Sequence, residues 1–303
     1  MSDKLRVAVT GASGFIGKKL LGVFRDHQVT GVCFSHPRPG LVPVDLRNSE
    51  SVRAFMDETR PDVVIHCAAR PSVDWCELHP EEARKTNLQA SYNLAGECGR
   101  RGSRVVFMST DYVFDGVNGP YTETDAPNPI NVYGRLKLEA ENAIRRLADK
   151  HIIVRTTNVY GFDPESKNFL MALLPRLARG EHVSVASDQF GNPILATDLC
   201  SVTKELVLKQ RTGTFHVAGP DLVNRVEWLR RAAQVFGADP SLVSGVLTSE
   251  LDQPAPRPRK SGLISKVLDS IVAKRAMNLD DGLNLLKREW DQHHMVPRVC
   301  EVA

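Results

Sequence analysis

The sequence predicts an α/β protein with a Rossmann-type, doubly wound parallel sheet and a smaller α/β substrate-binding domain. Short apolar strands alternate with helix-sized segments through the first half of the chain, and such repeats favour a parallel sheet with helices on both faces. A glycine turn at residues 11–17 follows the first strand and opens a helix. The length of 303 residues suits a nucleotide-binding domain with a smaller companion.

The elements of the first half follow one another in a regular order. Compact apolar runs predict strands, and apolar residues at helical spacing predict helices. Pro80 suits the first turn of a helix that extends to about residue 101. We expect strands at 5–9, 29–34, 41–46, 62–69, 104–110 and 151–155, with helices after the glycine turn, at 51–60, at 80–101 and around Tyr133.

The second half is less regular. Helices are expected at about 169–179, 198–209 and 226–236, a strand at 214–217 and a loop at 253–260. Asn224 is a candidate N-cap for the last of these helices. We therefore assign residues 1–161 plus about 195–220 to the Rossmann domain, and about 162–194 plus 221–303 to the substrate-binding domain.

Composition places the chain among ordinary globular proteins, with 42% apolar and 25% charged residues. The net charge is +3 with basic residues spread along the chain, which argues against nucleic-acid binding. No apolar run is long enough to span a bilayer. The six cysteines form no CxxC pair or metal-ligand spacing, and the start MSDKLRVAVTG leaves no room for a signal peptide. We expect buried reduced thiols, no metal, no membrane partner and a cytoplasmic protein.

A tyrosine and a lysine, Tyr133 and Lys137, stand four residues apart on a predicted helix. They therefore share one face and can point into one cleft. A lysine ammonium favours the phenolate, so we expect the pKa of Tyr133 to lie below its usual value of about 10. A helical tyrosine with a solvated lysine is the alternative, and the neighbouring motifs decide between them.

The glycine turn has the spacing Gly11-x-x-Gly14-x-x-Gly17, which differs from GxGxxG. Glycine lets the chain bend and lets its backbone approach a pyrophosphate, while the helix N-terminus offers free N–H groups. A plain strand-to-helix turn is the alternative interpretation.

Four segments together resemble the extended short-chain dehydrogenase/reductase family: TGASGFIG at 10–17, HCAA at 66–69, STDYVFDG at 109–116 and NVYGRLK at 131–137. Within that family, VDWCE at 73–77, DQFGNP at 188–193 and RPRKSGL at 257–263 resemble the dTDP-4-dehydrorhamnose reductases. The resemblance implies binding of NAD(H) or NADP(H) on a Rossmann sheet. Asn158, Ile194 and Ile264 depart from the reductase pattern, which leaves the hexose open.

The resemblance also implies a catalytic trio of Thr110, Tyr133 and Lys137. Thr110 would hold a substrate carbonyl oxygen, Tyr133 would give it a proton, and Lys137 would tune Tyr133 and contact the cofactor ribose. Without the trio, Thr110 would be a strand-end residue bonded to backbone. Cofactor contacts are expected at Gly11, Ser13, Gly14, Phe15, Ile16, Gly17, Ser35, Arg38, Asp45, Leu46, Cys67, Ala68, Ala69, Tyr133 and Lys137. Substrate contacts are expected at Val73, Asp74, Asn158, Gln189 and Arg257.

The choice of cofactor depends on the residues after the second strand, which include Ser35, His36 and Arg38 and no acid. An acid there usually binds the ribose of NAD, whereas a basic residue suits a 2′-phosphate. We therefore expect NADP(H) to be preferred over NAD(H), with a solvated Arg38 as the alternative. Asp45 could lie near the adenine or could cap the next turn. Arg257 suits a diphosphate, with a solvated basic loop as the alternative.

These expectations favour an enzyme that reduces the 4-keto group of a nucleotide-linked 6-deoxyhexose with NADPH or NADH, giving dTDP-L-rhamnose or a related deoxysugar. A second hypothesis, from another class, is an NADP-binding regulatory β subunit of methionine adenosyltransferase, which shares this fold and similar motifs. A sugar-nucleotide epimerase or dehydratase of the same family is less favoured, because STDYVFDG and DQFGNP match the reductases. The expected ligand is a nucleotide sugar, and a homodimer is compatible with the sequence.

Overall fold

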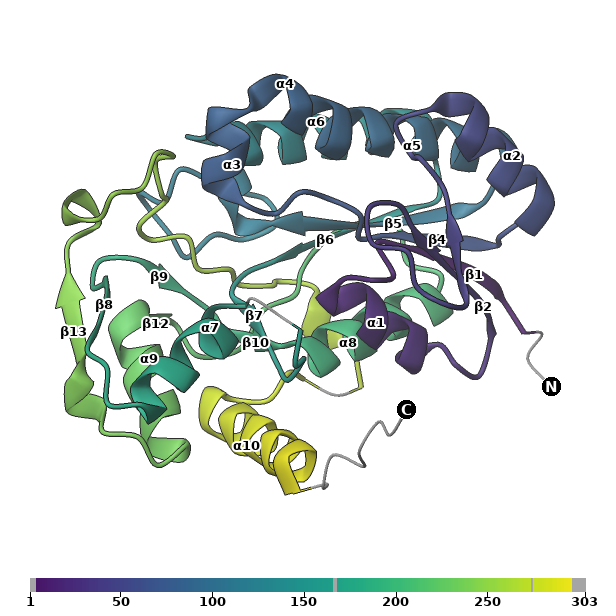
Figure 1. The fold of residues 1–303 in the computed structure, drawn as a ribbon. Coiled ribbons are helices and arrows are strands. Elements are labelled where there is room, and N and C mark those ends of the chain that lie inside the picture. Colours follow the sequence, from purple (N-terminus) through teal and green to yellow (C-terminus); the bar gives the residue numbers. More distant parts are fainter. Residues whose placement is uncertain (1–3, 166–167, 274, 296–303) are drawn as a thin grey trace.

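The computed structural model describes residues 4–165, 168–273 and 275–295. Its largest part is a seven-stranded parallel sheet in the order β11-β6-β5-β4-β1-β2-β3 (Figure 1). The strands are β1 (Arg6–Thr10), β2 (Gln28–Cys33), β3 (Leu41–Pro43), β4 (Val63–His66), β5 (Arg104–Thr110), β6 (His151–Thr156) and β11 (Gly213–His216). The order reverses between β1 and β4, and open parallel sheets bind their ligands at such a switch point.

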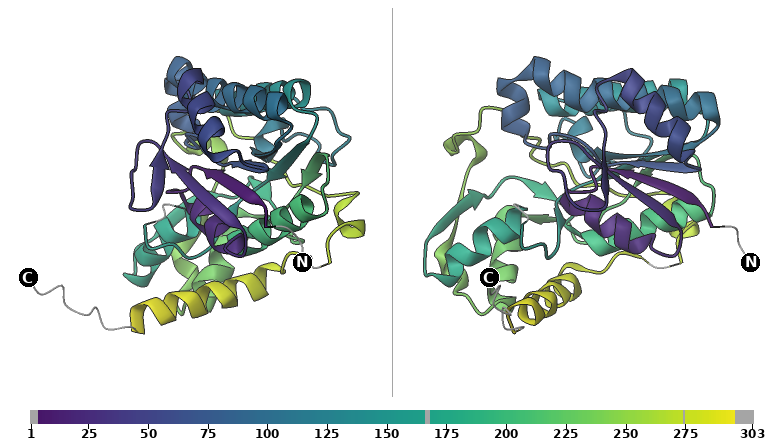
Figure 2. Two further views of the ribbon diagram at one scale, coloured as in Figure 1. Left: turned by 90° about the vertical axis from the view of Figure 1, so that its right-hand side faces the viewer. Right: turned by 45° about the vertical axis from the view of Figure 1, so that its right-hand side comes forward.

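Helices cover both faces of this sheet, which lies between them in Figure 2. Leu94 and Ile144 are fully buried on one face, and Leu20 and Leu206 are fully buried on the other. The first face holds α2 (Ser49–Thr59), α5 (Ala90–Arg101) and α6 (Val132–Leu147), and the second holds α1 (Phe15–Val23) and α8 (Ala196–Leu208). Burial of apolar helix faces on both sides of the strands is what defines a doubly wound α/β fold, as predicted.

The helix expected at 80–101 is interrupted. It consists of α4 (Pro80–Ala83), a π-helical turn (Arg84–Gln89) and α5, and an unexpected helix, α3 (Val73–Leu78), precedes it. Asn87, in the π-helical turn, accepts from the backbone nitrogen of Arg70 at 2.7 Å and donates to its carbonyl at 3.1 Å. The turn therefore holds the loop that follows β4, at the switch point of the sheet.

A further core lies at the left and bottom of Figure 1. It includes Tyr160, Trp228 and three leucines of the C-terminal helix, Leu279, Leu283 and Leu286. The elements around it are α7 (Phe169–Ala178), α9 (Arg225–Val235), α10 (Leu279–Met295) and the paired strands β8 (Val183–Ala186) with β13 (Val243–Val246), β9 (Phe190–Gly191) with β12 (Val223–Asn224), and β7 (Val159–Tyr160) with β10 (Ile194–Leu195). The expected helices and the returning strand are confirmed within two or three residues, and the division into two domains stays a prediction.

Short 3-10 turns complete the described structure at Asp111–Val113, Pro240–Leu242, Thr248–Glu250 and Leu268–Ser270. The cysteines that lie in the described part of the chain, Cys33, Cys67, Cys76, Cys98 and Cys200, are free thiols, and Cys300 lies outside that part. Within the same residues no helix is long and apolar enough to cross a membrane, and no cluster of three or more potential metal ligands is found.

Candidate active site

The glycine turn joins β1 to α1 at the switch point of the sheet. Gly11 has a φ of 66°, and a β-carbon there would lie 2.8 Å from the backbone nitrogen of Ala68, so glycine is required. The N-terminus of α1 has neither a side-chain cap nor an acidic first turn, which leaves its N–H groups for a phosphate. The remaining positions of the turn and of the first helical turn are Ser13, Gly14, Phe15, Ile16 and Gly17. This arrangement fits the pyrophosphate of a dinucleotide.

The end of β4 lies beside the glycine turn. Nδ1 of His66 is 2.8 Å from Oγ1 of Thr10, which also accepts from the backbone nitrogen of Ala68 at 3.3 Å. Burial, followed by the charge of Lys137, lowers the pKa of His66 to about 3, so its imidazole is neutral at neutral pH. Burial raises the pKa of Cys67 to about 12, which leaves an unreactive thiol. The predicted contacts Cys67, Ala68 and Ala69 thus belong to the segment after β4 that packs against Gly11.

Thr110, Tyr133 and Lys137 come together at the carboxyl end of the sheet. Thr110 ends β5, and the other two lie one turn apart near the start of α6. Nζ of Lys137 donates to the carbonyl of Met108 at 2.8 Å and lies 5.9 Å from the ring centroid of Tyr133. Lys137 is also close enough to Cys67 for its charge to oppose the rise that burial causes in the pKa of that thiol. The trio therefore adjoins the segment at 67–69 that is predicted to contact the cofactor.

A glycine allows α6 to approach this close. A β-carbon on Gly134 would lie 2.1 Å from the carbonyl oxygen of Tyr112, so any larger residue would push the helix away from the end of β5. The helix is also fixed at its start, because the side chain of Asn131 accepts from the nitrogen of Gly134 at 2.8 Å. The position of Tyr133 is therefore set by the residues on either side of it.

Burial dominates the proton equilibria of the trio. It raises the pKa of Tyr133 above its ordinary value, the charge of Asp111 raises it further, and a hydrogen bond with Thr110 opposes the rise. The predicted lowering of this pKa is therefore wrong, because the phenolate would lose more hydration than a neighbouring ammonium could replace. Burial also lowers the pKa of Lys137 to about 8. Tyr133 consequently keeps its proton at neutral pH and can act as a proton donor.

A buried carboxylate, Asp111, supports Thr110, and sequence reasoning missed it. It is 3% exposed and accepts from Oγ of Ser261 at 2.5 Å and from Oγ1 of Thr157 at 2.9 Å. Its other oxygen accepts from Oγ1 of Thr110 at 3.1 Å. Burial raises the pKa of Asp111 in spite of these three hydrogen bonds. The only signal in the sequence was its place directly after Thr110.

The predicted substrate residues Asp74 and Arg257 are paired with each other. Asp74, next to Val73 in α3, accepts from Nη2 of Arg257 at 2.6 Å and from the nitrogen of Ala255 at 3.1 Å. The side chain of Arg257 is only 9% exposed, so the solvated-loop alternative is wrong for this residue. Asn131 also donates to the carbonyl of Pro256 at 2.9 Å, which holds the loop against α3 and α6, beside Tyr133.

Two more of the predicted substrate residues are Gln189, which contacts this loop, and Asn158, which lies against Gly191. Nε2 of Gln189 donates to Oε1 of Gln253 at 3.2 Å, and Asn158 adopts a φ of 48° just before β7. The backbone nitrogen of Phe190 donates to the carbonyl of Arg259 at 2.6 Å. The structure thus joins the two segments that resemble the reductases, 188–193 and 257–263.

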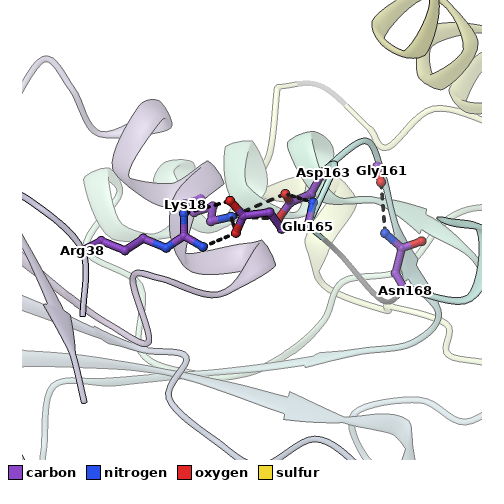
Figure 3. A network of polar contacts seen from close by, with 6 residues as sticks. All are labelled: Lys18, Arg38, Gly161, Asp163, Glu165 and Asn168. Atoms are coloured by element: carbon purple, nitrogen blue, oxygen red, sulfur yellow. Dashed lines mark hydrogen bonds and ion pairs between the residues drawn. The ribbon is translucent and has the colours of Figure 1, made fainter. Parts of the chain in front are cut away.

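The residues predicted to contact the adenosine follow β2 and β3. Oγ of Ser35 lies 2.9 Å from Nδ1 of His36. Asp45 accepts from the backbone nitrogen of Arg47 at 3.0 Å and from its Nε at 2.8 Å, as expected from the capping alternative. The next residue, Leu46, is buried. Arg38 follows in the same loop as Ser35 and pairs with a carboxylate from far along the chain, Glu165 (Figure 3).

Known proteins match nearly the whole chain. A family model described as RmlD substrate binding domain matches residues 5–288. A Haloferax volcanii protein named "Probable low-salt glycan biosynthesis reductase Agl14" is 34% identical over 294 residues, which are 94% of this chain and 98% of that protein. The methionine adenosyltransferase 2 subunit beta of Bos taurus is 31% identical over 278 residues, 88% of this chain and 82% of its own. A crystal structure of dTDP-4-dehydrorhamnose reductase from Bacillus anthracis in complex with NADP superposes with a TM-score of 0.88 and 29% identity, covering 95% of this chain and 100% of that one. The predicted fold class is confirmed.

Proposed function

The chain belongs to the RmlD substrate-binding family, as its motifs predicted, and we propose that it is an NAD(P)H-dependent sugar-nucleotide ketoreductase. The substrate we propose is a nucleotide-linked 4-keto-6-deoxyhexose, and the product is dTDP-L-rhamnose or a related deoxysugar. The observation that carries this proposal is the meeting of Thr110, Tyr133 and Lys137 beside the glycine turn. The names of the reductase relatives support it.

Each member of the trio has a separate role in this proposal. A bound nicotinamide would supply the hydride for the carbonyl carbon. Tyr133 gives its proton to the ketone oxygen, which becomes the hydroxyl of the product, and the raised pKa of its phenol keeps that proton in place until it is needed. Asp111 fixes the side chain of Thr110 beside the same oxygen, by accepting the one hydroxyl hydrogen of Thr110. The ammonium of Lys137 lies 5.9 Å from the ring centroid of Tyr133 and would contact the ribose of a bound cofactor.

The fit of the chain to a dinucleotide supports the cofactor part of the proposal. The open N-terminus of α1 suits the pyrophosphate, and Arg38 stands where a basic residue accommodates a 2′-phosphate. We therefore keep NADP(H) as the preferred cofactor, with NAD(H) as a weaker ligand.

Turnover by a Tyr133→Phe variant tests the mechanism. Purified protein is mixed with NADPH and dTDP-4-keto-6-deoxy-L-hexose generated in situ, and the loss of NADPH absorbance is followed. The variant should lose roughly a hundredfold to ten-thousandfold in turnover, while its dissociation constant for NADPH stays close to that of the parent chain. Undiminished turnover in the variant would refute the role of Tyr133.

A regulatory role is the second candidate, because the Bos taurus relative is a subunit of methionine adenosyltransferase. This candidate predicts a stable complex with a methionine adenosyltransferase catalytic chain in a pull-down, together with cofactor binding and no ketone-dependent oxidation of NADPH. Ketone-dependent oxidation that disappears in the Tyr133→Phe variant would favour the reductase.

A further inference from the structure

A network of charged side chains connects the loop after β7 with α1 and with the loop after β2 (Figure 3). Nη1 of Arg38 donates to Oε1 of Glu165 at 3.1 Å, and its Nη2 pairs with the other carboxylate oxygen. Nζ of Lys18 lies 3.2 Å from Oε2 of Glu165 and 3.3 Å from Oδ2 of Asp163. The carboxylate of Glu165, 127 residues away in the chain, thus binds both terminal nitrogens of the Arg38 guanidinium.

The segment that presents Glu165 is held in place at several points. Oδ1 of Asp163 accepts from the backbone nitrogen of Glu165 at 3.1 Å, a local turn that orients the second carboxylate. Nδ2 of Asn168 donates to the carbonyl of Gly161 at 3.0 Å. A β-carbon on Gly161 would lie 3.2 Å from the ring of Phe15, in the first turn of α1. The acidic segment therefore packs against the predicted pyrophosphate site.

The two cations differ in how strongly they depend on Glu165. Lys18 also pairs with Asp163, whose side chain is 11% exposed, so Lys18 keeps a carboxylate when Glu165 leaves. Arg38 and Glu165 are 39% and 54% exposed, which allows exchange with ligands from solvent. Because carboxylates and phosphates both present two oxygens to a guanidinium in the same bidentate geometry, a phosphate can replace Glu165 on Arg38.

We propose that Glu165 weakens the preference for NADP(H) over NAD(H) by competing with the 2′-phosphate of NADP(H) for Arg38. Binding of NADP(H) exchanges one anion for another on the guanidinium, whereas NAD(H) has no such phosphate and leaves the pair between Arg38 and Glu165 in place. The carboxylate therefore reduces the advantage of NADP(H) over NAD(H). This inference rests on the cofactor site of the proposed function and adds a residue outside the Rossmann motifs to it.

The expected effect is modest because both partners are exposed. Ion pairs of this kind change an equilibrium by about twofold to fivefold. Glu165→Gln should lower the dissociation constant for NADPH by this factor and leave that for NADH unchanged. The same variant should bind 2′,5′-ADP more tightly than the parent chain does and should bind AMP equally well. These two fragments of the cofactors differ only in the 2′-phosphate.

A matched control and a double variant make the test specific. Glu181→Gln is the control, because the Glu181 carboxylate likewise pairs with two cationic side chains, those of Arg176 and Arg179, around the end of α7. It should change neither dissociation constant. In an Arg38→Gln background, Glu165→Gln should no longer alter the ratio of the NADPH and NADH constants, since the shared partner is gone.

Fluorescence titrations with NADPH and with NADH give the dissociation constants of the four variants and the parent chain, and these test the inference. An unchanged ratio in Glu165→Gln, an equal gain for NADPH and NADH, or a gain that persists without Arg38 would each overturn the inference. The titrations need no turnover, so a chain that binds NADPH but reduces no ketone counts against the reductase only. A ratio that shifts in favour of NADPH, with no turnover, would leave the inference standing, and a shift in favour of NADH would overturn it.

Discussion

Replacing Asp111 by asparagine should lower activity without lowering stability. The carboxylate is buried beneath Thr110, and burial raises its pKa. A raised pKa means that the folded chain favours the neutral acid, so any stability from Asp111 is present at low pH and is lost as the pH rises through the folded pKa. At neutral pH the ionised group therefore opposes folding, and asparagine removes that charge while keeping the shape.

The size of the two effects follows from the contacts of Asp111. The hydroxyls of Ser261 and Thr157 can turn to accept from the new amide, so we expect the free energy of unfolding to stay constant or to rise by up to about 2 kcal/mol. The amide oxygen still accepts from Thr110, but a neutral acceptor makes a weaker hydrogen bond than a charged one, by about 1 kcal/mol. If that bond fixes the side chain of Thr110 in the transition state, turnover should fall by about threefold to tenfold.

Urea unfolding and NADPH oxidation measure these two quantities, and Asp115→Asn is the matched control. Asp115 accepts from the hydroxyl of Tyr121 at 2.5 Å and from the nitrogen of Val117 at 2.9 Å. These bonds lower its pKa, so its ionised form stabilises the fold at neutral pH and its loss should reduce the free energy of unfolding. An Asp111→Asn variant that is less stable than the Asp115→Asn variant, or that retains full turnover, would refute the reasoning.

Two further predictions concern other buried charges. Because burial lowers the pKa of Lys137 to about 8, its ammonium is lost as the pH rises through that value, and turnover should decline on the alkaline side with it. Lys137→Arg stays charged, so a pH profile with the same alkaline decline in that variant would assign the decline to another group. Glu141→Gln should lower the free energy of unfolding by about 3–5 kcal/mol, because Glu141 holds the buried guanidinium of Arg155 at 2.7 Å and the hydroxyl of Ser109 at 2.6 Å. Urea unfolding measures that loss, and a change below about 1 kcal/mol would show that Arg155 finds other partners.

The strands and the common helix of Tyr133 and Lys137 could be predicted because their signals are local. The strand expected at 104–110 has the same bounds as β5, since an unbroken apolar run there meets polar residues at both ends. The four-residue spacing of Tyr133 and Lys137 fixes their common face once α6 forms. The glycine turn was recognisable for the same reason, because strand, turn and helix follow one another directly.

Features that depend on distant segments were beyond sequence reasoning. Glu165 and Arg38 are 127 residues apart in the sequence. No motif near either residue indicates that the two side chains meet. The sign of the pKa shift at Tyr133 depends on how completely neighbouring segments bury it. The helix α3 was missed because six residues are too few to show a helical period.

The order of the segments around the two main cores limits how this protein can change in evolution. The chain leaves the large sheet after β6, returns for α8 and β11, leaves again for α9, and comes back at residues 268–272 before α10 packs on the second core. No single cut separates the two cores. A new sugar specificity cannot be gained by exchanging one contiguous block of gene for that of a relative, because several separate stretches would have to be replaced together. Point changes at single positions, such as Asn158 and Ile194, are the simpler route.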